Sequence, residues 1–286
     1  MLTLIKILSL LPLSVLYAIA QGLLYPLIYY VVRYRRKMVR HNLRLAFPDK
    51  PDNERQLIEK QFYHWFADLL AEIVHGYRAT DEEMRERIQY SGLDELTKAA
   101  RQHGGAMLMI GHIGCWEWYA EIAKQSATDL KFHYIYRRLK SESADKAMLE
   151  LRKKRGGDCI EKNLLLRRMV SYRKDHLPHI YCMLSDQKPS AQDLDYRLPF
   201  LNTDSPFITG TDTLARKFGY PVFYIDYTMP SRGHYIGRLK LITDAPEITD
   251  VGSITREYAK LLEQTILRTP HIWLWTHNRF KYSKPL

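Results

Sequence analysis

A histidine and a glutamate lie five positions apart in the segment MIGHIGCWEW, residues 109–118. His112 follows a short apolar run, and Gly111 and Gly114 allow the backbone to turn tightly around it. Glu117 would lie in the first turn of a following helix, where the free N–H groups and the helix dipole favour a carboxylate. From there it can accept a hydrogen bond from one imidazole nitrogen of His112 and leave the other nitrogen free to act as a base.

This pair has no serine or cysteine nucleophile assigned to it, which favours transfer to an alcohol whose hydroxyl proton the base removes. Cys115 lies between a glycine and a tryptophan, and we expect it to be a small buried residue. Spacings typical of zinc sites, nucleophile elbows and nucleotide-binding loops do not occur in the sequence. A capped helix beside a buried histidine explains the spacing of His112 and Glu117 equally well, so these two residues alone do not decide the chemistry.

The elements that would position this pair alternate between short β-rich runs and helical segments, after a long amphipathic helix expected over residues 53–77. The strand candidates are residues 106–111, 132–136, 179–184, 222–227 and 236–242, and the helical candidates are residues 93–102, 116–126, 142–155, 162–174, 209–218 and 253–268. This alternation predicts an α/β fold, a single domain with a central, mainly parallel sheet flanked by helices. His112 would then lie at the carboxyl end of a strand, where ligand sites collect.

The beginning of the chain has the composition of a membrane anchor helix. Twenty-six uncharged residues separate Lys6 from Arg33. As one helix they would reach about 39 Å, which exceeds the roughly 30 Å hydrocarbon core of a bilayer. Pro12 and Pro26 would each bend that helix, so a kinked or partly inserted anchor is as consistent with the sequence as a straight span. A cleaved signal peptide fits less well because the apolar run is longer than a typical signal core.

The charge of the chain predicts an anionic partner or surface. Forty-three basic residues against 32 acidic ones give a net charge of +11. Six of the basic residues lie between positions 33 and 44, and by the positive-inside rule this flank stays cytoplasmic. We therefore expect an N-terminal membrane anchor over residues 1–32 and a catalytic domain over residues 33–286 on the cytoplasmic side. Three cysteines without a Cys-x-x-Cys spacing argue against a disulfide framework and a structural zinc site.

Six ordered segments resemble the late acyltransferases of lipid A biosynthesis, the lauroyl and myristoyl transferases of Gram-negative bacteria. The segments are GHIGCWE at 111–117, which is similar to the family's His-x4-Asp/Glu motif, RHNLRLAFP at 40–48, YRRLKS at 136–141, LSDQKPS at 184–190, LPFLNTDSPFITGTDTLARKFGYPVFYI at 198–225, and IWLWTHNRFK at 272–281. The sequence departs from the family pattern at Arg138, Lys188 and Asn202, where proline, an acidic residue and glycine are usual. These departures leave the acceptor and the acyl chain length open.

The resemblance implies an acyltransferase that moves a fatty acyl chain from acyl carrier protein to a hydroxyl of a lipid A precursor, a secondary acylation. It implies His112 as the general base and Glu117 as the residue that orients it. Arg137 would bind substrate phosphate or the developing oxyanion, while Asp186 and Gln187 would hold the acceptor. Arg279 would bind phosphate or close the domain by packing.

The implied partners agree with the charge pattern. Residues 131–174 hold 14 Lys and Arg against five Asp and Glu, which suits an acidic carrier protein. The acceptor would be an anionic glycolipid or phospholipid in the inner membrane, with the catalytic domain on the cytoplasmic face. No metal, cofactor or nucleic acid is expected. Two alternatives remain: the same chemistry on a lysophospholipid, aminolipid or glycolipid, and a membrane-bound binding protein whose site has lost its activity.

Overall fold

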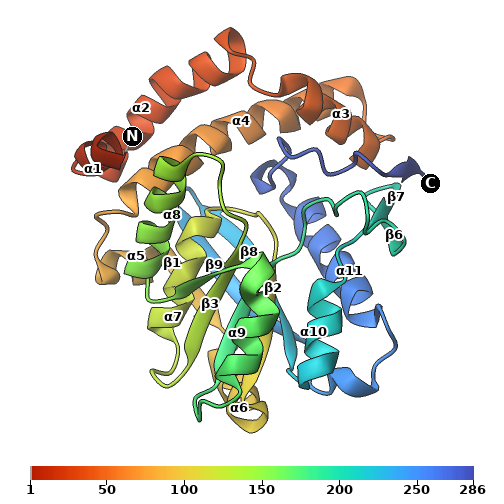
Figure 1. Cartoon of the computed structure of the whole chain (residues 1–286). Helices are drawn as coiled ribbons and strands as arrows, with labels where there is room; N and C mark the ends of the chain where they lie inside the picture. Colours follow the sequence, from red (N-terminus) through yellow and green to blue (C-terminus); the bar gives the residue numbers. More distant parts are fainter. Residues whose placement is uncertain (1) are drawn as a thin grey trace.

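A seven-stranded sheet forms the centre of the computed structural model, which describes residues 2–286 (Figure 1). Its strands, in spatial order, are β1 (Ile88–Ser91), β9 (His234–Thr243), β8 (Val222–Ser231), β2 (Gly105–Ile110), β5 (His179–Leu184), β3 (Lys131–Tyr136) and β4 (Asp158–Glu161). All neighbouring pairs are parallel except β8 and β9, which form a hairpin. The predicted α/β fold with a mainly parallel sheet is therefore confirmed.

The sheet's central strands form the middle of the hydrophobic core. Every residue of β2 is buried, as are the first four residues of β5. Strands buried on both faces carry continuous apolar runs instead of alternating ones, and this explains why the sequences AMLMIG and HIYCML are apolar throughout.

Helices flank the sheet and connect its strands. They are α5 (Asp81–Arg87), α6 (Leu93–His103), η3 (Trp116–Glu121), α7 (Ile122–Gln125), α8 (Glu142–Lys154), η4 (Lys162–Leu164), α9 (Leu165–Tyr172), α10 (Gly210–Phe218), η5 (Pro246–Ile248), α11 (Ser253–Arg268) and η6 (Pro270–Ile272). Each strand and helix predicted between residues 53 and 268 occurs with small differences at the ends, although those at 116–126 and 162–174 begin as the 3₁₀ helices η3 and η4. The short edge strands β1 and β4 were not predicted, because four residues paired on one side give little periodicity.

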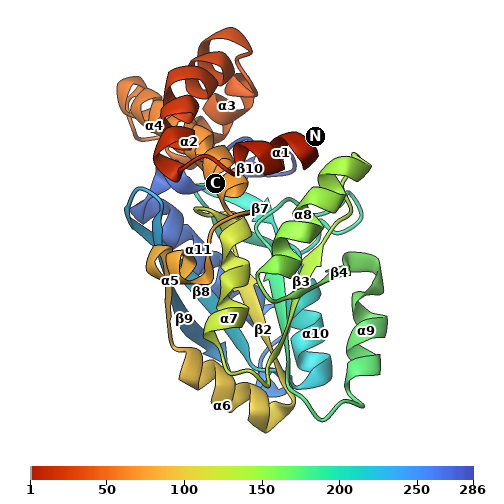
Figure 2. The same ribbon diagram turned by 90° about the vertical axis from the view of Figure 1, so that its left-hand side faces the viewer.

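The N-terminal elements gather at one end of the sheet. They are α1 (Leu2–Leu8), α2 (Leu13–Ile19), η1 (Ala20–Leu24), η2 (Leu27–Val31), α3 (Arg36–Ala46) and α4 (Asp52–His75). Figures 1 and 2 place them beyond the end at which β2 and β5 finish, whereas α6, which leads into β2, lies at the opposite end. The expected single anchor helix is broken at Pro12, which stands at the N-cap of α2. Within residues 2–286, Leu13–Val31 is the one stretch of helix long and apolar enough to cross a bilayer.

A small second sheet stands beside the main one, close to the C-terminus. It contains β6 (Arg197–Phe200), β7 (Thr203–Pro206) and β10 (Lys284–Pro285), all antiparallel. The side-chain amide of Asn202 in the β6–β7 turn donates to the carbonyl of Ala46 at 2.9 Å, so this sheet is tied to the end of α3.

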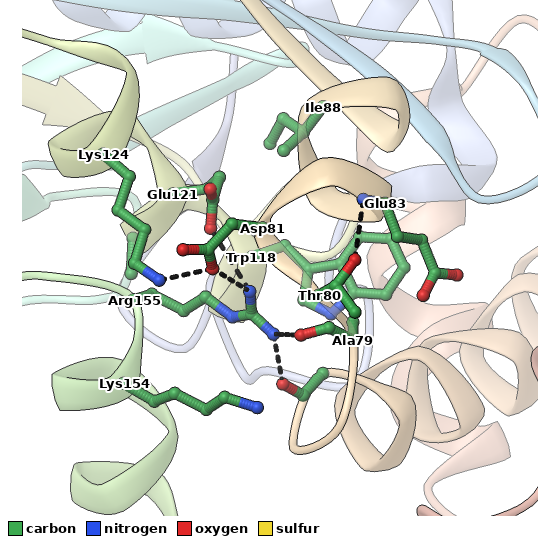
Figure 3. Close-up of polar contacts among 12 residues, drawn as sticks. Ala79, Thr80, Asp81, Glu83, Ile88, Trp118, Glu121, Lys124, Lys154 and Arg155 are labelled. Carbon is green, nitrogen blue, oxygen red and sulfur yellow. Dashed lines mark hydrogen bonds and ion pairs between the residues drawn. The ribbon is translucent and has the colours of Figure 1, made fainter.

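A buried arginine joins α8 to the segment after α4 and to η3 (Figure 3). The Arg155 side chain is fully buried, and it donates to the carbonyls of Gly76 and Ala79 at 2.5 and 2.9 Å. Its guanidinium also lies 3.4 Å from the carboxylate of Glu121 and 3.6 Å from that of Asp81. Burial raises the pKa of Glu121, and Arg155 opposes that rise. The cluster stabilises the turn that follows α4 and holds it against the last residue of η3.

Replacing Arg155 by leucine should lower the free energy of unfolding by about 3–5 kcal/mol, because Glu121 would be left buried without a cation. Lys153→Leu, at an exposed position on the same helix, should change it by less than about 0.5 kcal/mol. The double change Arg155→Leu and Glu121→Leu should recover most of the loss. Urea unfolding measures all three, and equal losses for the Arg155 and Lys153 variants would contradict the assignment.

Candidate active site

The register of the central sheet brings His112 and Asp186 together. Ile110, the last residue of β2, pairs with Leu184, the last residue of β5, and the two strands are parallel. His112 and Asp186 each follow two residues later, so both occupy the loops at the carboxyl edge of the sheet. This edge is where ligand sites of α/β proteins collect.

Asp186 holds His112 through two hydrogen bonds. Its Oδ1 lies 2.6 Å from the imidazole Nδ1, and its Oδ2 accepts from the backbone N–H of His112 at 2.8 Å. The indole N–H of Trp273 donates to the same Oδ2 at 2.9 Å. Burial alone would raise the pKa of Asp186, but His112 and Trp273 outweigh it and lower the pKa to about 2. The carboxylate is therefore ionised at neutral pH and fixes the proton of the imidazole on Nδ1.

The second imidazole nitrogen of His112 is left for a substrate. Its Nε2 lies 3.3 Å from the side-chain amide nitrogen of Gln187. With the ring proton on Nδ1, Nε2 carries the lone pair and the amide donates to it. The ring of Trp116 packs edge-on against the imidazole, with 5.2 Å between ring centroids. The nitrogen that could accept a proton is thus defined, and a reacting hydroxyl would displace the Gln187 contact.

The segment after α11 closes the site from the C-terminal side. The backbone N–H of Leu274 donates to the carbonyl of His112 at 3.2 Å, and Gly114 N–H donates to Ile272 at 2.9 Å. Asn42, from the RHNLRLAFP segment, is buried and donates to the carbonyls of Trp275 and His277 at 2.9 and 2.8 Å. Two segments that the sequence marked as family motifs therefore hold the histidine loop from outside.

Glu117 does not hold His112, and this part of the sequence interpretation is corrected. Its carboxylate instead pairs with Arg152 of α8 through two hydrogen bonds of 2.8 Å each. It also accepts from the indole N–H of Trp116 at 3.2 Å, so the Trp116 ring links Glu117 to the imidazole. The expected contact fails because Asp186, from the next strand, already occupies Nδ1. Asp186, which the sequence suggested as a ligand of the acceptor, holds the imidazole in place of Glu117.

The other expected substrate ligands occupy very different surroundings. Arg137 is exposed just beyond the end of β3, on the same edge of the sheet as His112. Arg279 is almost fully buried, and its three guanidinium nitrogens have no hydrogen-bond partner within residues 2–286. The guanidinium lies over the rings of Phe207 and Phe200, at 4.4 and 5.3 Å from their centroids. Burial lowers the pKa of Arg279 to about 10, so it remains a cation that packs inside the protein.

Cys115 has the surroundings of a packing residue. It is fully buried, and burial together with the nearby carboxyl of Glu72 raises the pKa of its thiol. A thiol with a raised pKa is a poor nucleophile at neutral pH. Within the described chain no group of three or more His, Cys, Asp or Glu side chains could hold a metal ion.

These features define the class of protein: an α/β protein with a histidine–aspartate pair at the carboxyl ends of two adjacent parallel strands. The chain belongs to the bacterial lipid A biosynthesis acyltransferase family, whose model matches residues 1–282. It is 24% identical over 252 residues to the lipid A biosynthesis palmitoleoyltransferase of Escherichia coli, covering 86% of this chain and 79% of that protein. The same values relate it to a lipid A biosynthesis acyltransferase of Shigella flexneri. The family resemblance predicted from the six segments is therefore confirmed.

Because Glu117 contacts Arg152 and not His112, the two charged residues should act as one unit. Arg152→Met should lower activity and melting temperature as much as Glu117→Gln does, and the double variant should be no worse than either single one. Turnover and thermal unfolding are measured for the wild type and the three variants, which together form a double-mutant cycle. A fully active Arg152→Met variant beside an inactive Glu117→Gln variant would show that Glu117 acts on the imidazole directly.

Proposed function

We propose that this lipid A acyltransferase moves a fatty acyl chain from acyl carrier protein to a hydroxyl of a lipid A precursor, with His112 as general base. Family membership establishes acyl transfer in lipid A synthesis as the activity. The observation that supports the mechanism is the hydrogen bond between Asp186 and Nδ1 of His112, which leaves Nε2 unprotonated.

The reaction needs one proton to move twice. Nε2 of His112 removes the proton from the acceptor hydroxyl as its oxygen attacks the thioester carbonyl carbon. The tetrahedral intermediate collapses, the carbon–sulfur bond breaks, and the thiolate takes the proton back from the imidazolium. The products are an ester and a free thiol. Asp186 stays ionised throughout because its pKa is about 2. Its negative charge stabilises the imidazolium that forms on His112.

Four further side chains would support this step. Arg137 lies at the open edge of the sheet and would neutralise a substrate phosphate or the developing oxyanion. Gln187 would turn its amide from Nε2 to the acceptor when the hydroxyl arrives. Glu117 positions the base indirectly through Trp116, and Arg152 keeps its carboxylate in place.

The donor would dock on basic side chains beside the site, although not on Arg152 or Arg155. Arg152 and Arg155 are largely or fully buried in ion pairs and do not present their charges to a partner. Arg138, Lys140 and Lys162 are exposed, and they follow the paired strand ends Tyr136 and Glu161. We call these three residues the basic rim. Its place at the carboxyl edge would bring a carrier-bound thioester toward His112.

The proposal is tested with acyl carrier protein charged with a fatty acid and a tetra-acylated lipid A precursor. His112→Ala and Asp186→Asn should each lower turnover by about 10²–10⁴. The first removes the general base, and the second removes the carboxylate that holds the base in its reactive tautomer. Their combination should cost little more than His112→Ala alone, because they act as one unit.

Cys115→Ala is the control and should keep most of the activity, since the direct-transfer scheme uses no thiol of the enzyme. A trapped acyl-thioester on Cys115 would contradict the scheme. Transfer to a lysophospholipid, with the lipid A precursor left unchanged, would show that the acceptor is a lysophospholipid and not the lipid A precursor.

Charge reversal tests the basic rim. Arg138→Glu with Lys162→Glu should raise the Michaelis constant for the acylated carrier at least about tenfold, with turnover at saturation little changed. Wild-type activity should fall similarly as salt approaches about 0.3 M, where exposed charges are screened. The matched control, Lys217→Glu with Arg256→Glu, reverses exposed charges on α10 and α11. With a short uncharged thioester as the donor, neither the charge reversal of the rim nor the added salt should change the rate. If this donor and the acylated carrier respond alike, docking at the rim is excluded.

A further inference from the structure

Polar contacts tie the apolar N-terminal segment to the side of α4. Tyr17 donates its hydroxyl to the carboxylate of Glu72 at 2.8 Å. Gln21, near the middle of the segment, donates to the carboxylate of Asp68 at 2.6 Å and to the carbonyl of His64 at 3.0 Å. The segment therefore lies along α4 and does not project from the protein.

These contacts conflict with a membrane crossing. Helix α4, which the segment contacts between Tyr63 and Glu72, carries seven charged residues along its whole length. They are Asp52, Glu54, Arg55, Glu59, Lys60, Asp68 and Glu72. If Leu13–Val31 crossed the bilayer, α4 would have to enter with it, or the contacts of Tyr17 and Gln21 would break. A single charged side chain at the bilayer centre costs about 2.5–3.5 kcal/mol or more. The geometry thus favours a segment that keeps α4 out of the hydrocarbon core.

The segment has one face for the protein and another for its surroundings. The buried face consists of Leu13, Leu16, Ala20, Tyr25 and Tyr29. The hydrogen bonding of η1 and η2 is of the π type, from residue i to i+5, which keeps positions four or five apart on one face. The outward face consists of Leu10, Val15, Leu23, Leu27, Tyr30, Val31 and Val32, which are 41–72% exposed. Seven large apolar side chains exposed on one short segment mark an interaction site.

We propose that residues 2–32 lie in the plane of the membrane surface, with the outward face in the lipid boundary and the following basic residues at anionic headgroups. Arg33, Lys37 and Arg44 are exposed and suit that charge, whereas Arg36 and Arg40 are engaged by Glu59. An in-plane amphipathic element buries its apolar side about 5–10 Å into the headgroup region and needs no crossing. The proposal rests on the proposed function only in assuming that the acceptor is a membrane lipid.

This position places the candidate site against the lipid. Figures 1 and 2 show the N-terminal elements at the end of the sheet where β2 and β5 finish. A cavity of about 250 Å³ lies between α4 and the β8–β9 hairpin, and its lining includes His64, Trp65 and Asp68. Tyr25 of the segment stacks on His64, with ring centroids 3.7 Å apart. The ring centroids of Trp65 and Trp116 are 6.4 Å apart, and Trp116 packs against His112, so packed aromatic rings lead from the lining of the cavity to the base.

Side-specific labelling distinguishes an in-plane segment from a span. In a Cys159→Ser background, where Cys115 and Cys182 are buried, single cysteines at Thr3 and Lys37 mark the two ends of the segment. The full chain is placed in sealed inner-membrane vesicles of both orientations and treated with an impermeant maleimide. Both positions should react only in inside-out vesicles. Reaction of Thr3→Cys in right-side-out vesicles, with Lys37→Cys protected there, would overturn the proposal.

Flotation with vesicles of phosphatidylcholine and phosphatidylglycerol tests which face binds lipid. Leu23→Glu with Val31→Glu should lower vesicle binding roughly 10- to 100-fold, while the melting temperature stays near that of the wild type because both side chains are exposed. The matched control is Ile248→Glu with Val251→Glu, at apolar positions outside the segment that are even more exposed, and it should bind as the wild type does.

Unchanged vesicle binding of the Leu23 and Val31 variant would overturn the proposal, as would an equal loss in the control. If light scattering shows that the variant instead converts a dimer to a monomer, the outward face is an interface between copies. Activity on a detergent-dispersed acceptor should survive in the variant. Its loss there, with lipid binding changed as expected, would count against the proposed function and not against the membrane position.

Discussion

The carboxylate of Asp186 is the group on which the rest of the candidate site depends. It accepts hydrogen bonds from the backbone and the imidazole of His112 and from the indole of Trp273, which come from widely separated parts of the chain. A buried carboxylate is stable only when its oxygens are satisfied by donors. The sheet register, the histidine loop and the C-terminal segment therefore have to be in place together, and the imidazole tautomer follows from their arrangement.

Two arginines at the end of α8 stabilise the helix that follows the histidine loop. Arg152 binds Glu117, and Arg155, the residue that follows α8, lies against Glu121 at the end of η3. Both carboxylates are buried, and each would be costly without its cation. This double pairing explains why a short 3₁₀ helix can hold Trp116 against the imidazole. It also explains why basic residues that look suited to a carrier protein are engaged inside the fold.

The sequence predicts the fold well because hydrophobic periodicity is a local property. The runs 106–111 and 179–184 were identified as strands, and Asp186 and Gln187 were placed at a strand end near the acceptor. What the sequence could not supply is the order of strands in space. The parallel pairing of β2 with β5 makes Asp186 the partner of His112, and no spacing along the chain reveals that pairing. Glu117, five residues away, was the nearer choice and is the wrong contact. For Arg279 the sequence leaves phosphate binding and packing both open, and the structure places its guanidinium over the rings of Phe200 and Phe207.

An anchor that lies flat changes the way in which the two substrates are found. A lipid acceptor confined to one leaflet would reach the carboxyl edge of the sheet by diffusion in two dimensions. Its encounter rate would follow its mole fraction among the surrounding lipids and would fall when other lipids dilute it. The carrier protein would arrive from solution in three dimensions, at a rate set by its molar concentration. The enzyme would therefore respond to the surface density of one substrate and to the bulk concentration of the other, so membrane composition and carrier supply would control its output separately.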